Sequence, residues 1–174
     1  MQLLLPPKII KRLQRELRRA GKQEIGGLLM GEHVRDEVFR VVDISVQRAG
    51  GSQACFSRDP KAHKTKLQEF FSRTGENYSR FNYLGEWHSH PSFEPLPSST
   101  DIETMQSIVS DPSVGVNFLT LIIARLPSRA TIELTATAFR VGVSPVAVPV
   151  SVEADTQTPH EGTAGSWLRR IFRW

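Results

Sequence analysis

Apolar side chains recur along the chain with two periods, one typical of helices and one typical of strands. Helical spacing predicts three helices, over residues 7–21, 60–73 and from about 101 onwards. Alternating or continuous apolar runs predict strands over residues 24–31, 38–46, 81–87, 117–124 and 131–141, with an edge strand over 146–152. This order predicts a single-domain α/β fold in which a mixed β-sheet is flanked by helices.

The composition is that of one globular domain. The chain has 174 residues, of which 39% are hydrophobic and 23% are charged. No apolar run approaches the roughly 20 residues that cross a bilayer, so no membrane span is expected. Residues 1–7 lack a basic leader, and the single cysteine, Cys55, excludes an internal disulfide. We therefore expect a cytoplasmic protein.

The end of the sequence differs from the rest in composition. We expect the folded domain to comprise residues 1–152, followed by a polar, glycine-containing linker over 153–166. Residues 167–174 are aromatic and basic. They are candidates for docking on the domain itself, for dimerisation, or for contact with a partner or a membrane.

The chain has a net charge of +4 and a pI of about 9.6. Its positive charge is concentrated in the first predicted helix and in residues 167–174. Only one acid, Glu16, stands among the basic residues of the first predicted helix, which are Lys8, Lys11, Arg12, Arg15, Arg18, Arg19 and Lys22. Such a cluster could contact nucleic acid or an anionic membrane. No aromatic residues interleave with it, which favours a solvated helix face, so no nucleic-acid partner is expected.

A metal site is indicated around His88 and His90. These histidines are one residue apart at the end of a predicted strand, where alternation puts both side chains on one face. Two imidazoles on one face are suitable zinc ligands, and the carboxylate of Asp101 follows a stiff proline-rich loop over residues 91–97. Two histidines and one carboxylate leave a fourth tetrahedral position open for water. An open position is typical of a catalytic zinc ion.

Three further polar residues are candidates for roles at this site. Ser98 lies three residues before Asp101, where its hydroxyl could donate to an oxyanion or merely cap the helix. Glu24 could act as general base and then general acid, provided that its strand lies near the one that ends at His88. Glu86 alternates with His88 and His90. It is expected either to support the ligands from behind or to face solvent.

These residues resemble the motifs of the JAB/MPN (JAMM) metalloproteases. The string His88-Ser89-His90, seven residues, Ser98, two residues and Asp101 is similar to that family's metal motif. The stretch from Glu24 to Gly31 resembles its catalytic-glutamate strand. The resemblance implies one catalytic Zn²⁺ on His88, His90 and Asp101, with Glu24 and Ser98 as catalytic residues. It also implies a sheet and helices layered as in cytidine deaminases.

The resemblance implies an isopeptidase or peptidase that cleaves after the C-terminus of a ubiquitin-like protein or its conjugate. Gly85-Glu86-Trp87 stands where eukaryotic members tend to have aromatic residues, and long insertions are absent. These differences favour the stand-alone bacterial branch. Some of its members are encoded beside conjugating-enzyme homologues, including in antiphage systems, so a conjugating-enzyme homologue is a candidate partner.

Three other functions remain open on the sequence. One is a peptidase that releases a small adduct from a sulfur-carrier protein in biosynthesis. The second is a DNA-associated protein, for which the basic first helix is the only added support. The third is an interaction module without catalytic activity, which the complete set of candidate ligands disfavours.

Overall fold

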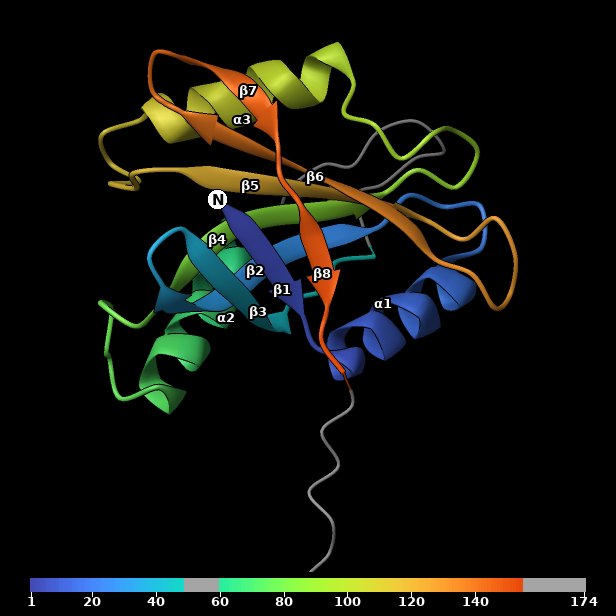
Figure 1. The fold of residues 1–174 in the computed structure, drawn as a ribbon, viewed down its shortest axis with the longest axis horizontal. Helices are drawn as coiled ribbons and strands as arrows, with labels where there is room; N and C mark the ends of the chain where they lie inside the picture. Colours follow the sequence, from blue (N-terminus) through green and yellow to red (C-terminus); the bar gives the residue numbers. More distant parts are fainter. Residues whose placement is uncertain (49–59, 155–174) are drawn as a thin grey trace, which may run out of the picture.

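The computed structural model describes residues 1–48 and 60–154. Within them the chain forms, in order, β1 (Gln2–Leu5), α1 (Pro7–Ala20), β2 (Gly26–Arg35), β3 (Val38–Ile44), α2 (Pro60–Arg73), β4 (Phe81–Ser89), α3 (Ser99–Ser110), β5 (Leu119–Arg125), β6 (Glu133–Arg140), β7 (Val143–Ala147) and β8 (Val150–Val152) (Figure 1). The predicted α/β class is confirmed. Cys55 and residues 155–174 lie outside the described residues.

The strands form one mixed sheet in the order β7-β6-β5-β4-β2-β3-β1-β8. β4 pairs with β5, and β1 pairs with β3 and β8, in parallel, whereas the remaining neighbours are antiparallel. β7 and β8 are consecutive in the chain, yet they form opposite edges of the sheet. Only Val148 and Pro149 separate them, and three Cα steps span at most about 11 Å. The sheet is therefore curled until its two edges come close together.

The predicted single edge strand over residues 146–152 is wrong, because this segment is divided between the two edges. Val148 donates its backbone N–H to Ala136 of β6 over 2.9 Å, and Leu3 of β1 donates to the carbonyl of Pro149 over 3.0 Å. Proline has no N–H and cannot continue the ladder that Ala147 ends. The chain changes partner at Pro149, and β8 pairs with the otherwise unpaired side of β1.

Strand β1 was not among the predicted strands. It is four residues long and is followed at once by Pro6 and Pro7, so it gives no readable alternation. Its partners are distant in sequence, since Leu3 pairs with Phe39 of β3 and with Val150 of β8. Leu3 and Leu5 are fully buried, which explains why this short strand is held in the sheet.

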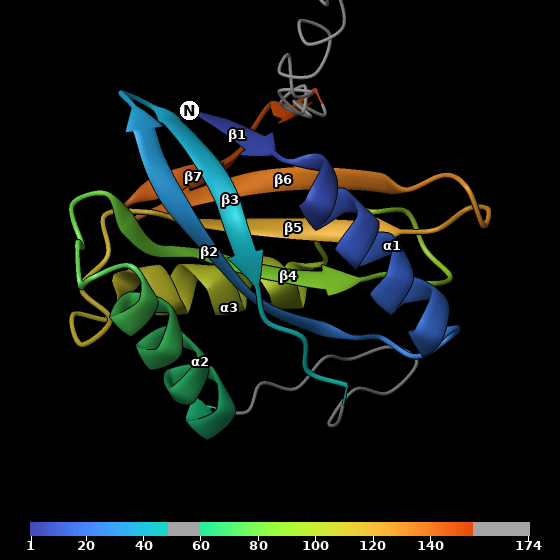
Figure 2. The same cartoon turned by 90° about the horizontal axis from the view of Figure 1, so that it is seen from below.

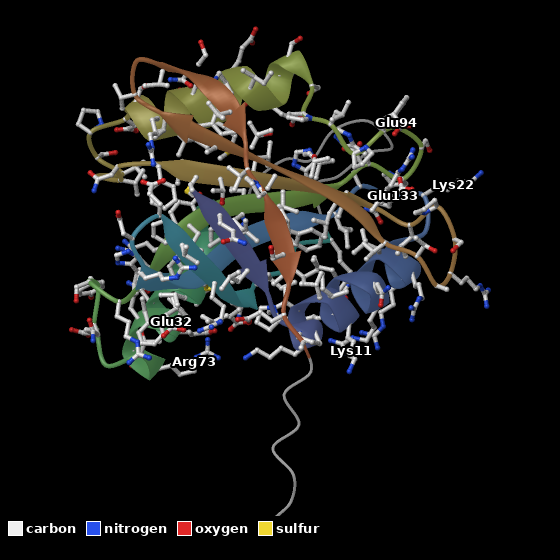
Figure 3. All side chains as sticks on the ribbon, in the orientation of Figure 1. Lys11, Lys22, Glu32, Arg73, Glu94 and Glu133 are labelled. Carbon is white, nitrogen blue, oxygen red and sulfur yellow. The ribbon has the colours of Figure 1, made fainter. Side chains whose placement is uncertain are left out.

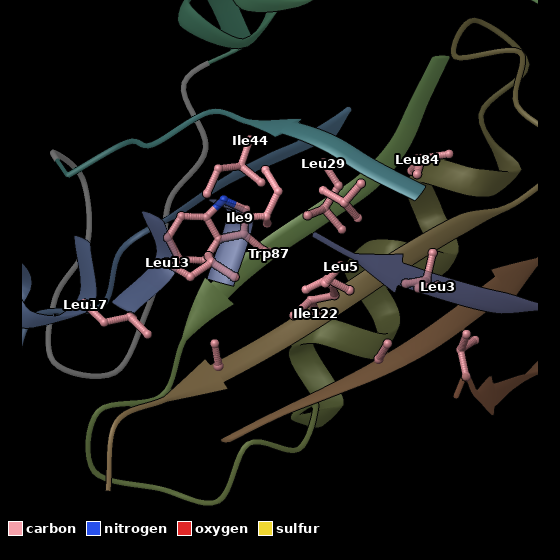
Figure 4. Packing of buried hydrophobic residues seen from close by; sticks show 14 of the residues in the cluster. Leu3, Leu5, Ile9, Leu13, Leu17, Leu29, Ile44, Leu84, Trp87 and Ile122 are labelled. Atoms are coloured by element: carbon pink, nitrogen blue, oxygen red, sulfur yellow. The ribbon is translucent and has the colours of Figure 1, made fainter. Parts of the chain in front are cut away.

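The two faces of the sheet are covered by different helices. On one face α1 buries Ile9 and Leu13 against the ring of Trp87, as Figure 4 shows. On the other face α3 packs Met105 and Val109 on a set of β5 and β6 residues. α3 lies over β5 and β6 (Figure 1), and Figure 2 shows α2 beside β2. Burial of these apolar side chains is the main stabilising contribution to the fold.

The register of β4 decides on which face the candidate site lies. Glu86 and His88 are aligned with Leu121 and Ile123 of β5, which pack against α3. Trp87 points to the α1 face, as alternation requires. The first candidate metal ligand is thus on the face that carries the start of α3.

Two close backbone approaches explain the glycines beside the site. A Cβ on Gly27 would lie 2.3 Å from the carbonyl oxygen of Ser45. Gly85 has φ of +135°, and a Cβ there would lie 2.0 Å from the carbonyl oxygen of Thr120. These glycines let β2 and β4 pack closely against neighbouring backbone while keeping the ladder that aligns Gly26 with His88.

The basic residues of α1 are partly neutralised by ion pairs. Arg12 contacts Asp43 at 2.5 Å, and the buried carboxylate of Glu16 contacts Arg15, Arg19 and Arg48. Arg73 of α2 also pairs with Asp43, at 2.6 Å. Asp43 of β3 thus joins α1 to α2, and part of the positive charge of α1 is used in ion pairs that stabilise the fold. In the described part of the chain, no helix has the length and apolar character needed to cross a membrane.

Candidate metal centre

His88, His90 and Asp101 converge from three elements of the chain. His88 lies within β4, His90 directly follows this strand, and Asp101 is in the first turn of α3. One potential ligand atom from each lies within 4.8 Å of the other two. The Nε2 atoms of His88 and His90 are 3.2 Å apart, and Asp101 Oδ1 is 3.3 Å from His88 Nε2. The structure therefore brings together the three residues proposed as ligands.

The separations fit a small tetrahedral ion. Two nitrogens that each lie about 2.0–2.1 Å from one tetrahedral Zn²⁺ are roughly 3.3–3.4 Å apart. The His88–His90 and His88–Asp101 separations are close to this value, and His90 Nε2 lies 3.8 Å from Asp101 Oδ2. Both histidines are buried, so their nitrogens have little access to bulk water. This donor set of two imidazoles and one carboxylate is suited to zinc.

The loop between the second histidine and α3 fixes the imidazole of His90. His90 Nδ1 is 3.1 Å from the carbonyl oxygen of Glu94, the geometry of an Nδ1–H donor that leaves Nε2 free for the site. The backbone N–H of His90 donates to Ala124 over 3.0 Å. Thr135 of β6 donates its hydroxyl hydrogen to the carbonyl of Pro95. The loop that follows β4 is thus attached to the sheet at two points, at His90 through β5 and at Pro95 through β6.

Ser98 and Asp101 form a capping box at the start of α3. The Ser98 hydroxyl accepts from the Asp101 N–H over 3.2 Å, and the Ser98 N–H donates to Asp101 Oδ2 over 2.8 Å. The same hydroxyl also lies 2.6 Å from Oδ2, to which it donates. Ser98 therefore caps the helix, as one of its two predicted roles requires. The oxyanion role remains a prediction.

Electrostatics favour an ionised Asp101. Burial alone would raise the pKa of the Asp101 carboxyl. The hydrogen bond and charge of His88, together with the hydrogen bonds from Ser98, outweigh burial and hold this pKa well below its usual range. A carboxylate that is ionised throughout the neutral range is always available to a cation.

Glu24 is placed beside the three candidate ligands by the pairing of β2 with β4. Gly26 is aligned with His88, and Glu24 is two residues before Gly26. The carboxyl of Glu24 is buried, and burial raises its pKa above the usual value, while nearby His90 and His88 oppose this rise. A base with a raised pKa binds a proton more strongly, which suits a group that takes and returns one.

Ser89, the residue between the two histidines, holds the backbone next to Glu24. Its hydroxyl accepts from the Ile25 N–H over 3.0 Å, and its own N–H donates to the Ile25 carbonyl over 2.8 Å. Alternation points Ser89 away from the histidine face, so sequence reasoning gave it no role. Its role depends on the hydrogen bond from Ile25, a residue 64 positions away in the sequence.

We expect Ser89→Ala to lower turnover while zinc binding is retained. The substitution leaves the buried Ile25 N–H without its acceptor, at a cost of about 1–3 kcal/mol in unfolding free energy. Displacement of Glu24 by a fraction of an ångström would reduce kcat by roughly 10- to 100-fold. Ser45→Ala is the matched control, because Ser45 accepts from the Leu28 N–H, further along the same strand. Equal loss of kcat in both variants would contradict a specific positioning role.

Glu86 is buried, so the solvent-facing alternative for this residue is wrong. It lies on the same face as His88, and the hydroxyl of Tyr83 donates to Glu86 Oε1 over 3.5 Å. A buried carboxylate two positions from a ligand is compatible with the predicted support of the site from behind. That role stays a prediction.

The curled mixed sheet and the candidate ligand set of two histidines and one aspartate match the class of JAB-type metalloprotease domains. The chain belongs to the family described as prokaryotic homologs of the JAB domain, whose model matches residues 6–155. The resemblance inferred from the two sequence motifs is thereby confirmed.

Several characterised proteins are similar to this chain. A "CD-NTase/cGAS isopeptidase" of Vibrio cholerae is 38% identical over 105 residues, which cover 59% of this chain and 62% of the relative. Another protein of this name, from Enterobacter hormaechei, is 29% identical over 63% of this chain and 59% of the relative. The "ubiquitin carboxyl-terminal hydrolase RPN11" of Saccharomyces cerevisiae is 31% identical over 51% of this chain and 28% of the relative. The chain thus spans less than two thirds of the length of each of these relatives.

A solved structure supports the fold. The protein DSY2949 from Desulfitobacterium hafniense superposes with a TM-score of 0.67 over 91% of this chain and 98% of that one. The two sequences are 20% identical, so this similarity concerns the fold alone.

Proposed function

We propose that this protein is a zinc-dependent isopeptidase that cleaves the amide bond after the C-terminus of a ubiquitin-like protein. The observation that carries the proposal is the convergence of His88, His90 and Asp101 beside the buried carboxyl of Glu24. Three ligands leave the fourth position for the reaction, as in other catalytic zinc sites. The names of the similar isopeptidases and of the RPN11 hydrolase support this class of substrate.

The chemistry divides between the ion and the side chains. Zinc held by His88, His90 and Asp101 would supply a Lewis acid for the scissile carbonyl and would make water acidic enough to attack near neutral pH. Glu24 accepts the proton of the attacking water on its carboxylate. After the carbon–nitrogen bond breaks, the same carboxyl returns the proton to the leaving amine.

Ser98 donates to the oxyanion that forms on the carbonyl oxygen of the substrate. For this its hydroxyl hydrogen must turn away from Asp101 Oδ2, to which it donates in the structure. The Ser98 N–H donates to the same oxygen, so the carboxylate keeps a hydrogen bond during the change. Ser98 is exposed, which leaves its hydroxyl accessible to a substrate.

A polypeptide substrate is favoured by the apolar side chains next to the site. Phe93 and Leu96, on the loop between His90 and Ser98, are 58% and 59% exposed. Large exposed apolar residues beside a reactive centre are typical of surfaces that bind another chain. Because two relatives are named CD-NTase/cGAS isopeptidases, a conjugate of a CD-NTase is the first substrate to test. A role in antiphage defence belongs to the same proposal.

The test is cleavage of defined conjugates by the purified chain. We expect about one zinc per chain by elemental analysis, and cleavage of a lysine-linked conjugate with release of an intact ubiquitin-like C-terminus by mass spectrometry. A chelator should abolish cleavage, and added Zn²⁺ should restore it. Full activity after complete metal removal would contradict the proposal. Release of only a small adduct from a sulfur-carrier protein would favour the biosynthetic peptidase instead.

A further inference from the structure

A groove separate from the metal centre lies between α1, β6 and β8. It has a volume of about 450 Å³, and its apolar lining is Ile10, Ile132, Leu134, Val150 and Val152. Most of these side chains are half-buried, and Val152 is 61% exposed. An apolar groove of this size, left open to solvent, is suited to receive side chains from another segment.

The rim of the groove is acidic. Glu94 and Glu133 both border it, and Figure 3 shows them near each other at the start of β6. Arg125 pairs with both, at 3.0 Å to Glu94 and 2.6 Å to Glu133. The charged residues that line the groove are thus both acidic. A matching ligand is therefore apolar and basic.

The chain itself contains a segment of this chemistry. Residues 167–174 read Trp-Leu-Arg-Arg-Ile-Phe-Arg-Trp, so five of these eight residues are apolar or aromatic, three are arginine and none is acidic. The chain runs along the groove in β8, where Val150 and Val152 line it, and twelve residues, 155–166, then separate Ala154 from this segment.

The connection between groove and segment is long enough for intramolecular binding. From Val152 to Trp167 there are 15 Cα steps, with a reach of up to about 50 Å. A short tether gives an effective concentration of about millimolar, so even a weak contact would be substantially populated. Aromatic and arginine side chains contribute most of the binding energy in such contacts.

We propose that residues 167–174 bind in the groove between α1, β6 and β8 of their own chain. Apolar side chains of the segment cover Val152 and Leu134, and its arginines pair with Glu94 and Glu133. The wall of this groove includes Pro95 and Glu94, and the Glu94 carbonyl contacts His90. The bound segment thus contacts the loop that joins two proposed metal ligands.

Tryptophan fluorescence of the full chain tests the proposal, because the chain has three tryptophans and Trp87 is fully buried. If the segment is bound, Trp167 and Trp174 are shielded from acrylamide. In Val152→Arg we expect a red-shifted emission and a roughly twofold larger quenching constant, since both rings would enter water. Val146→Arg is the matched control, because Val146 is an edge-strand valine of 58% exposure on β7, away from the groove. Both valines are exposed, so either variant should fold.

Two outcomes would overturn the proposal. Equal quenching in the wild type, Val152→Arg and Val146→Arg would show that the groove does not hold the segment. Protection that disappears on dilution, with a dimer detected by light scattering at higher concentration, would show that the segment binds a second copy instead. Protection that is independent of concentration and lost only in Val152→Arg is the result expected.

Discussion

Glu24→Gln is expected to lower kcat for conjugate cleavage by roughly 100- to 10,000-fold, the usual contribution of a general acid–base group. Glutamine has nearly the same shape as glutamate but cannot accept the proton of the attacking water. The carboxyl is buried beside His88 and His90, but it is not one of the three converging ligands, so bound zinc should stay near the wild-type level. Steady-state kinetics together with elemental analysis of the same sample would separate these two effects.

The control for this variant is Glu103→Gln, the same change at an exposed position of α3. It should leave both kcat and zinc content unchanged. If Glu24→Gln lost its zinc, Glu24 would have to be a ligand, and the assignment of Asp101 would need revision. If Glu24→Gln kept full activity, another group would have to be the base.

Asp101→Asn is expected to lower zinc occupancy together with activity. The amide oxygen can still accept the Ser98 N–H bond, so the capping box is largely kept, whereas the negative charge that attracts the ion is lost. Affinity for Zn²⁺ should fall by more than the 10- to 100-fold seen when partners behind a metal ligand are removed. A titration against a zinc chelator of known affinity would measure this change.

Asp111→Asn is the matched control at the other end of α3, where Asp111 accepts a hydrogen bond from the Ser113 N–H over 2.8 Å. This variant should bind zinc normally. Asp101→Ala would add the loss of the cap, at about 1 kcal/mol of unfolding free energy. Unchanged zinc affinity in Asp101→Asn would exclude the carboxylate as a ligand.

The convergence of His88, His90 and Asp101 was predictable because the information for it is local. His88 and His90 share a face through strand alternation alone, and a short stiff loop brings Asp101 back to them. The position of Glu24 was predicted only on the condition that two strands lie side by side. The β2–β4 pairing meets that condition, although Ile25 and its partner Ser89 are 64 positions apart. The helix over residues 60–73 was also readable, since its proline start and apolar spacing lie within one segment.

The features that were missed depend on contacts between distant parts of the chain. Strand β1 has no pattern of its own and is defined by β3 and β8. The division of residues 146–152 between two edges follows from closure of the sheet. A short stretch of sequence carries no signal of this closure. The role of Ser89 is similar, because its side chain faces away from the histidines and has a partner only once β2 lies beside β4.

The pairing of β1 with β8 has a consequence for how the protein folds. Leu3 bonds to Pro149, so this contact joins the first and last described strands across 146 residues. Contacts of such sequence separation form slowly, because the entropy of the whole intervening chain is lost before they are made. During synthesis, the last described strand of the sheet is available only after Val150–Val152 has been translated. His88, His90 and Asp101 come much earlier, so a nascent chain carries all three proposed metal ligands before its sheet is closed.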